Sequence, residues 1–163
     1  MMVILKYTAS SLLRKPAFSV IIPSRDEGDS LLYTIDSIAK TEAPAFETVI
    51  VDDKSRDDPE RIILDRGYPN VKVVKGMGKG PALARNAGAE HATGEILIFC
   101  DAHVRVPPNW LMVISEAFSD RTIAALSPGI GVAEGSKRIG YGLTWDRELN
   151  VRWLQRPETE VAE

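Results

Sequence analysis

The chain has 163 residues, of which 44% are hydrophobic and 26% charged, and its formal net charge at pH 7 is -3. That length fits one domain with a core large enough to fold without disulfides, and the single cysteine, Cys100, cannot form one within the chain. The negative charge and the lack of a long Lys/Arg run argue against a nucleic-acid-binding protein, and no apolar run reaches the length of a membrane-spanning helix.

The first segment, residues 1–17, mixes apolar and basic residues. Its basic residues lie on the wrong side of the apolar stretch for a signal peptide. We expect a loose N-terminal arm or a short interfacial helix here. A single cysteine suits a reducing compartment, so we expect a cytoplasmic protein, with attachment to the membrane surface as the alternative.

From residue 18 onward, short β-branched strands alternate with helices. The predicted strands cover 18–23, 47–53, 71–74 and 95–101, and the predicted helices cover 29–39, 59–66 and 81–91. Apolar strands separated by helices are typical of a mostly parallel sheet with helices on its faces. Further on, we predict a helix over 108–118, a strand over 123–128 and an irregular hairpin over 135–153 that lies over the site.

Polar clusters follow three of the predicted strands: SRDE at 24–27, DDKS at 52–55 and DAH at 101–103. In open α/β sheets, ligands bind at the carboxyl ends of the strands. The sequence therefore predicts a binding site made by these three clusters.

Asp101 and His103 are candidate metal ligands. Side chains two residues apart in an extended segment point to the same side, so a carboxylate and an imidazole would converge beyond a buried strand. This donor pair suits Mn²⁺, and Mg²⁺ less well, and it leaves positions open for a diphosphate. The alternative is that Asp101 caps a turn and His103 is a solvated loop residue. The position beside the other two clusters favours the metal.

Asp52 and Asp53 are adjacent at a strand end, so their side chains point to opposite sides and one of them faces the site. A carboxylate can accept the N–H of a uracil or a ribose hydroxyl, and we favour Asp53 for the base. The alternative is a turn in which one of the two caps the helix that begins near Asp57.

The glycine-rich stretch over 76–88 matches neither the dinucleotide fingerprint nor the P-loop spacing. Its stronger part is Arg85 with Asn86, on a helix whose N-terminus approaches the site. The alternative is a solvated surface helix, which we prefer for Lys79.

Four segments resemble family-2-type glycosyltransferases of the GT-A fold in order and spacing: FSVIIPSRDEG, VIVDDKS, GPALARNAG and GEILIFCDAHVRVPPNWL. The resemblance covers 18–111 and implies a Rossmann-like GT-A fold with its C-terminal part truncated. The domains expected from it are an arm at 1–17, a nucleotide-sugar-binding domain at 18–134, and a hairpin and tail at 135–163 that begin the acceptor half.

The resemblance also implies a set of site residues. The nucleotide sugar would be bound by Pro23, Ser24, Arg25, Glu27, Asp53, Gly80, Arg85, Asp101 and Ala102, and the metal by Asp101 and His103. The family usually has Asn where Arg25 stands. The Asp-Ala-His at 101–103 is similar to the D-x-H of the polypeptide N-acetylgalactosaminyltransferases, as is the segment over 141–153, and we interpret this as kinship with that branch.

The acidic motif that supplies the base in inverting members has no counterpart in this sequence, so the catalytic residues stay unassigned. We expect metal-dependent transfer of a sugar from a nucleoside-diphosphate sugar, with UDP favoured, to an unknown acceptor. The alternative is a non-catalytic nucleotide-sugar-binding module or one half of an assembly. A sugar nucleotidyltransferase should carry a glycine-rich loop with arginine after the first strand, and SRDEGDS is not that loop. The apolar residues Trp145, Trp153 and Leu154 favour self-association through the truncated face.

Overall fold

The computed structural model describes residues 3–6, 17–43, 45–131, 139–141, 143–148 and 150–154. The chain forms two compact units, Met1–Leu126 and Ser127–Glu163. Within the described residues, no helix is long and apolar enough to cross a membrane.

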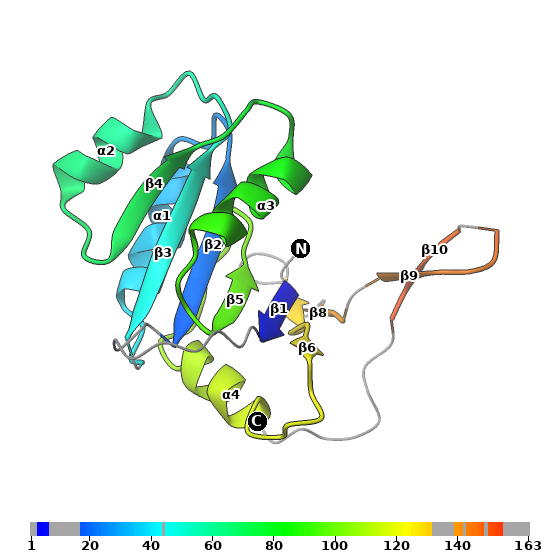
Figure 1. The fold of residues 1–163 in the computed structure, drawn as a ribbon. Helices are drawn as coiled ribbons and strands as arrows, with labels where there is room; N and C mark the ends of the chain where they lie inside the picture. Colours follow the sequence, from blue (N-terminus) through cyan, green and yellow to red (C-terminus); the bar gives the residue numbers. More distant parts are fainter. Residues whose placement is uncertain are drawn as a thin grey trace. The chain divides into compact units, whose positions relative to one another are not determined.

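The first unit is built on a six-stranded sheet in the order β4-β3-β2-β5-β1-β6 (Figure 1). The strands are β1 (Val3–Lys6), β2 (Phe18–Ser24), β3 (Phe46–Asp52), β4 (Val71–Lys75), β5 (Ile96–Phe99) and β6 (Ala125–Leu126). β2 pairs in parallel with β3 and β5, and β3 in parallel with β4. β1 is antiparallel to both of its neighbours. The carboxyl ends of β2, β3 and β5 therefore meet at one edge, as the sequence predicts.

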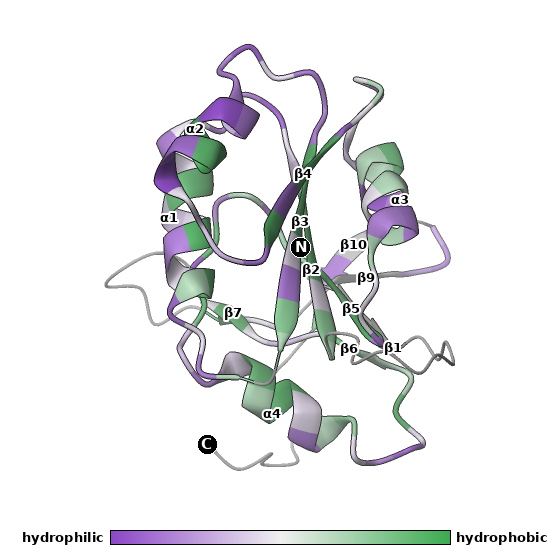
Figure 2. Ribbon diagram, turned by 60° about the vertical axis from the view of Figure 1, so that its left-hand side comes forward, coloured by the Kyte–Doolittle hydropathy of each residue, from purple (hydrophilic) through white to green (hydrophobic). Residues whose placement is uncertain are grey.

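Helices cover both faces of this sheet (Figure 2). They are α1 (Asp29–Ala39), α2 (Pro59–Arg66), α3 (Pro81–His91) and α4 (Trp110–Ala117). α1 and α2 lie on one side of the sheet and α3 lies on the other (Figure 2). α4 contributes to the same core cluster as α1. This arrangement confirms the predicted α/β architecture.

The core follows the two-residue period of the strands. On β2, Phe18, Val20 and Ile22 are buried in the cluster that includes α1 and α4. The intervening Ile21 packs on the α3 side, in a cluster with Ala84 of α3. Because both faces are covered, β2 buries apolar side chains on both sides of the sheet.

α3 lies close against the sheet at Gly88. A Cβ atom at this position would overlap Cγ2 of Ile21 and come within 3.1 Å of Cγ2 of Val51. A larger residue would force the helix outward. Gly88 therefore sets the spacing that lets Arg85, one helical turn earlier, reach the strand ends.

The N-terminal segment differs from our expectation. We expected a loose arm or a short helix over 1–17, but Val3–Lys6 is a strand that pairs with β5 from Val3↔Phe99 to Lys6↔Ile96. This pairing covers an edge of β5 that would otherwise leave backbone groups unpaired. Residues 7–16 lie outside the described residues.

Three other elements also have boundaries that differ from our expectation. β5 ends at Phe99, and Ala102–His103 form a turn, whereas we expected strand up to residue 101. α4 begins at Trp110 and not at 108, because Pro107 and Pro108 precede it. The expected strand over 123–128 is reduced to Ala125–Leu126.

The second unit contains two small antiparallel ladders. β7 (Ile130–Gly131) pairs with β8 (Ile139–Gly140), and β9 (Leu143–Trp145) pairs with β10 (Val151–Trp153). Asp146 orders the β9–β10 turn, since its carboxylate accepts bonds from the backbone N–H of Asn150 and from the guanidinium of Arg152. This is the expected hairpin, and its position over the site stays a prediction. The expected boundary at residue 134 lies outside the described residues.

Candidate functional site

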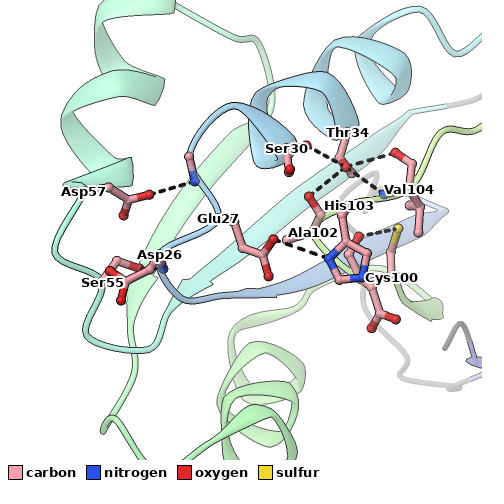
Figure 3. A network of polar contacts seen from close by, with 12 residues as sticks. Asp26, Glu27, Ser30, Thr34, Ser55, Asp57, Cys100, Ala102, His103 and Val104 are labelled. Atoms are coloured by element: carbon pink, nitrogen blue, oxygen red, sulfur yellow. Dashed lines mark hydrogen bonds and ion pairs between the residues drawn. The ribbon is translucent and has the colours of Figure 1, made fainter.

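The loops that follow β2 and β3 are tied to each other by charged hydrogen bonds. The Asp26 carboxylate accepts the backbone N–H of Arg56 at 2.7 Å and forms an ion pair with its guanidinium at 2.9 Å. The hydrogen bond from the Arg56 backbone, with that from its side chain, lowers the pKa of Asp26. The Asp57 carboxylate accepts the N–H of Gly28 at 2.8 Å (Figure 3). The loop after β2 and the loop after β3, which carry the predicted clusters at 24–27 and 52–55, are therefore joined into one continuous surface, which we call the wall.

Thr34 fixes the loop that follows β5. Its hydroxyl lies 2.9 Å from the carbonyl oxygens of Ala102 and Val104, and it accepts the N–H of Val104 at 3.0 Å (Figure 3). The Thr34 side chain is fully buried on α1. The backbone on either side of His103 is thus held by a helix that also begins at the site. We did not predict this role. The signal for it was a polar threonine on the apolar face of the helix, beside the apolar residues at 31, 35 and 38.

Asp101 lies on the α3 side of the sheet. Leu97 and Phe99 of β5 also pack on the α3 side. Its carboxylate forms an ion pair with Arg85 of α3, with Nη2 and Oδ1 2.7 Å apart, and the two side chains are 21% and 22% exposed. The Nε of Arg85 is buried and has no hydrogen-bond partner within the described parts of the chain. Arg85 is therefore a cation of the site and not a solvated surface residue.

His103 has a different neighbour. Its Nδ1 lies 3.3 Å from Oε2 of Glu27, and the histidine side chain is 62% exposed (Figure 3). We expected Asp101 and His103 to converge because they are two apart in an extended segment, but the turn at Ala102–His103 removes that geometry. Among the residues that the structure describes, no group of three or more His, Cys, Asp or Glu side chains could hold an ion. The assignment of Asp101 and His103 as metal ligands therefore stays a prediction.

Asp53 holds the glycine-rich loop in place. Its Oδ1 accepts the N–H of Gly78 at 2.6 Å and its Oδ2 that of Gly80 at 2.8 Å. Both glycines have positive φ angles, 72° and 95°, which a residue with a side chain rarely adopts. Gly80 then begins α3 as its N-cap. The residue that we favoured for the base therefore also organises the loop before α3.

Asp52 points the other way, as two adjacent strand residues should. Its carboxylate accepts the N–H of Ser55 at 2.8 Å and lies 3.2 Å from Nζ of Lys75. Burial raises the pKa of Asp52, but these hydrogen bonds outweigh burial and leave it lowered. Neither aspartate caps α2, because that cap is Asp58, which accepts the N–H of Arg61.

The other predicted site residues lie at the same strand ends and differ in exposure. Ser24 and Ala102 are buried, Pro23 is half-buried and Arg25 is exposed. The Ser24 carbonyl accepts the N–H of Asp53 at 2.8 Å, which joins the ends of β2 and β3. Cys100 is fully buried, and burial raises the pKa of its thiol to about 12, so it is a packed residue as we expected.

Comparison with known proteins shows which family the sequence matches. The family described as "Glycosyl transferase family 2" matches residues 19–159. Polypeptide N-acetylgalactosaminyltransferase 15 of Mus musculus is 32% identical over 158 residues, which cover 89% of this chain and 25% of the relative. The uncharacterized glycosyltransferase YibD of Escherichia coli is 35% identical over 92 residues, 55% of this chain and 27% of the relative. The chain spans about a quarter of the length of such curated relatives.

Solved structures resemble part of the chain. TarS of S. aureus in complex with UDP superposes with a TM-score of 0.57 at 32% identity, over 64% of this chain and 32% of that one. The mannosyltransferase PcManGT from Pyrobaculum calidifontis, in complex with GDP-Man and Mn²⁺, has a TM-score of 0.53 at 29% identity, over 57% of this chain and 29% of that one. These likenesses confirm the expected GT-A fold.

Proposed function

The chain belongs to glycosyl transferase family 2, and we propose that it is the donor-binding part of an enzyme that transfers a sugar from a UDP-sugar to an acceptor. The proposal rests on two features at the carboxyl ends of the parallel strands. Arg85 forms an ion pair with Asp101, and Asp53 holds the glycine-rich loop through two backbone N–H groups. Structural neighbours in complex with UDP and with UDP-GlcNAc support the choice of nucleotide.

In this proposal, the wall formed by the β2 and β3 loops binds the nucleoside. A carboxylate can accept about four hydrogen bonds, so Asp53 keeps capacity for a base N–H after it has bound two glycine amides. Ser24 and Arg25 lie on the β2 side of this wall. The Arg56–Asp26 pair and the Asp57–Gly28 bond hold that loop in place before a ligand arrives, which lowers the ordering cost of binding.

The diphosphate would lie against Arg85 and the donors at the end of β5. Asp101 and His103 would hold a divalent ion such as Mn²⁺ through one carboxylate oxygen and one imidazole nitrogen. Such an ion neutralises the charge of a diphosphate leaving group. A neighbour in complex with GDP-Man and Mn²⁺ supports this part of the proposal. Arg85 holds the Asp101 carboxylate, and Thr34 holds the backbone of the loop.

The test is a calorimetric titration of UDP and of GDP into the purified chain, each with Mn²⁺ and with EDTA. We expect UDP to bind in Mn²⁺ and to lose affinity in EDTA. His103→Ala and Asp101→Asn should remove the metal dependence. His91→Ala is the matched control, because His91 is the other histidine and is exposed on α3.

A folded chain that binds neither nucleotide would contradict the donor-binding proposal. Nucleotide binding with the same metal dependence in His103→Ala would contradict the metal assignment alone. Release of UDP from a UDP-sugar by the chain would exclude the reading as a non-catalytic binding module.

A further inference from the structure

We propose that Glu27 is a positioning residue for His103, and that its carboxylate fixes the imidazole in the form that can bind a metal. The observation is the contact between Nδ1 of His103 and Oε2 of Glu27, 3.3 Å apart (Figure 3). The proposal rests on the proposed function, since it concerns the same metal donor. It gives Glu27 a role different from the nucleotide contact that the family resemblance implies.

The chemistry follows from the two groups. A neutral imidazole carries its proton on one nitrogen and offers a lone pair on the other, whereas an ionised carboxylate only accepts. In the neutral imidazole, this contact favours the tautomer that carries the proton on Nδ1 and leaves the lone pair on Nε2. Metal-binding histidines in general donate their second ring N–H to a carboxylate or carbonyl, which orients the ring and makes the ligating nitrogen more basic.

Hydrogen bonds hold the backbone around both His103 and Glu27, so the contact between them does not depend on a mobile loop. His103 lies between Ala102 and Val104. The buried hydroxyl of Thr34 accepts the N–H of Val104 and lies within hydrogen-bond distance of the carbonyl oxygens of both residues. The carbonyl of Glu27 accepts the N–H of Ser30 at 3.1 Å in the first turn of α1. The next residue after Glu27 is held through its N–H by Asp57.

The imidazole also has open space beside it. The His103 side chain is 62% exposed, whereas that of Glu27 is 28% exposed. A hollow of about 130 Å³ next to His103 is lined by Ser30, Tyr33, Thr34, His103, Val104 and Arg105. The more buried carboxylate is thus the fixed partner, and the histidine is the side chain that remains accessible to an ion.

Two measurements test the proposal, the first without any metal. The chain has only two histidines, so the imidazole nitrogens of a ¹⁵N-histidine sample can be assigned with His91→Ala. The Nδ1 of His91 lies 2.8 Å from the carbonyl oxygen of Ala87, which makes it an internal reference. We expect His103 to carry its proton on Nδ1 in the wild type and to lose that preference in Glu27→Ala, while the His91 signals stay unchanged.

The second measurement is Mn²⁺ affinity in the presence of UDP, by calorimetry. Loss of a carboxylate behind a metal-binding histidine weakens metal binding by about 10–100-fold, and we expect this for Glu27→Ala. Glu27→Gln keeps an oxygen that accepts from Nδ1–H, so its affinity should stay within about 3-fold of the wild type if Glu27 acts through the histidine. Glu116→Gln, an exposed substitution on α4, is the matched control.

The outcomes separate this proposal from the one on which it rests. A wild type with no Mn²⁺-dependent UDP binding overturns the metal site, and with it any role of Glu27 towards a metal. If the wild type binds but Glu27→Ala shows the same tautomer or the same Mn²⁺ affinity, only the role of Glu27 is overturned. An equal loss in Glu27→Gln and Glu27→Ala would overturn it too, because it would make Glu27 a direct metal ligand.

Discussion

The guanidinium of Arg85 and the carboxylate of Asp101 lie 2.7 Å apart, and nearly four fifths of each side chain is removed from solvent. The first residue of the candidate metal motif is therefore already balanced by a cation of the protein. A divalent ion that binds Asp101 must share this carboxylate with Arg85 or displace the guanidinium from it.

Arg85→Ala should destabilise the fold, because it leaves a mostly buried carboxylate without its cation. Charged hydrogen bonds of this kind contribute about 1–3 kcal/mol, and we expect a loss of that order in urea-induced unfolding. Arg61→Ala is the control, since its pair with Asp65 is 3.9 Å long with side chains 79% and 73% exposed. An equal loss in both variants would show that the Arg85–Asp101 pair contributes nothing specific.

Asp53→Ala should release the glycine-rich loop. The N–H groups of Gly78 and Gly80 would lose their acceptor, at a cost of about 1–3 kcal/mol. We expect faster amide hydrogen exchange at these two glycines and weaker UDP binding. Unchanged exchange at both amides, in a variant that still folds, would contradict the role given to Asp53.

Thr34→Val should loosen the loop after β5 while it preserves the shape of the core. The N–H of Val104 would lose its buried acceptor, and the expected destabilisation is about 1–3 kcal/mol. Thr34→Ser keeps the hydroxyl and should recover most of this loss. Thermal unfolding of both variants measures the difference, and equal melting temperatures would argue against the hydroxyl as the anchor of Ala102–Val104.

The free energy of unfolding should depend on pH through Glu47, at the opposite end of the strands. Burial raises the pKa of Glu47, but hydrogen bonds from Lys72, Ser19 and Thr93 outweigh burial and bring it to about 2, against an ordinary 4.5. A folded-state pKa below the unfolded value means that the ionised group stabilises the fold above pH 4.5, and that this contribution is lost as the pH falls towards about 2.

Glu47→Gln should therefore be less stable than the wild type near neutral pH, by about 1–3 kcal/mol. The difference should shrink between pH 4.5 and about 2. Thermal melts across this range, with Glu116→Gln as the exposed control, measure it. A difference that stays constant down to about pH 2 would exclude the ionised Glu47 as its source.

The sequence was sufficient for the architecture wherever two local signals agreed. The helices over 29–39 and 81–91 have both ends where we predicted them, because apolar periodicity coincides with end signals such as Gly80 followed by Pro81. The meeting of the strand-end loops was also predicted, since it follows from parallel strands alone. The four-residue strand β1 was missed, because so short an apolar run does not indicate a partner distant in the sequence.

The pairing of side chains within the site could not be predicted. The sequence over 95–101 gave no sign that the strand would stop at Phe99. We expected Asp101 and His103 to converge because we extended the strand two residues too far. The loops of the wall also turn at Asp26 and Lys54, with φ angles of 55° and 64°. Non-glycine residues adopt such angles only when surrounding contacts compensate, and those contacts are invisible in a sequence pattern.

The position of β1 has a consequence for how the chain folds. β1 lies between β5 and β6, so it cannot pair until residues 96–99 have been made, and its second neighbour follows only at residues 125–126. Pairings between distant segments slow folding and prolong the exposure of open strand edges. A variant in which β1 cannot pair would keep its helices and binding loops but present β5 to other chains, and aggregation during expression would be its characteristic defect.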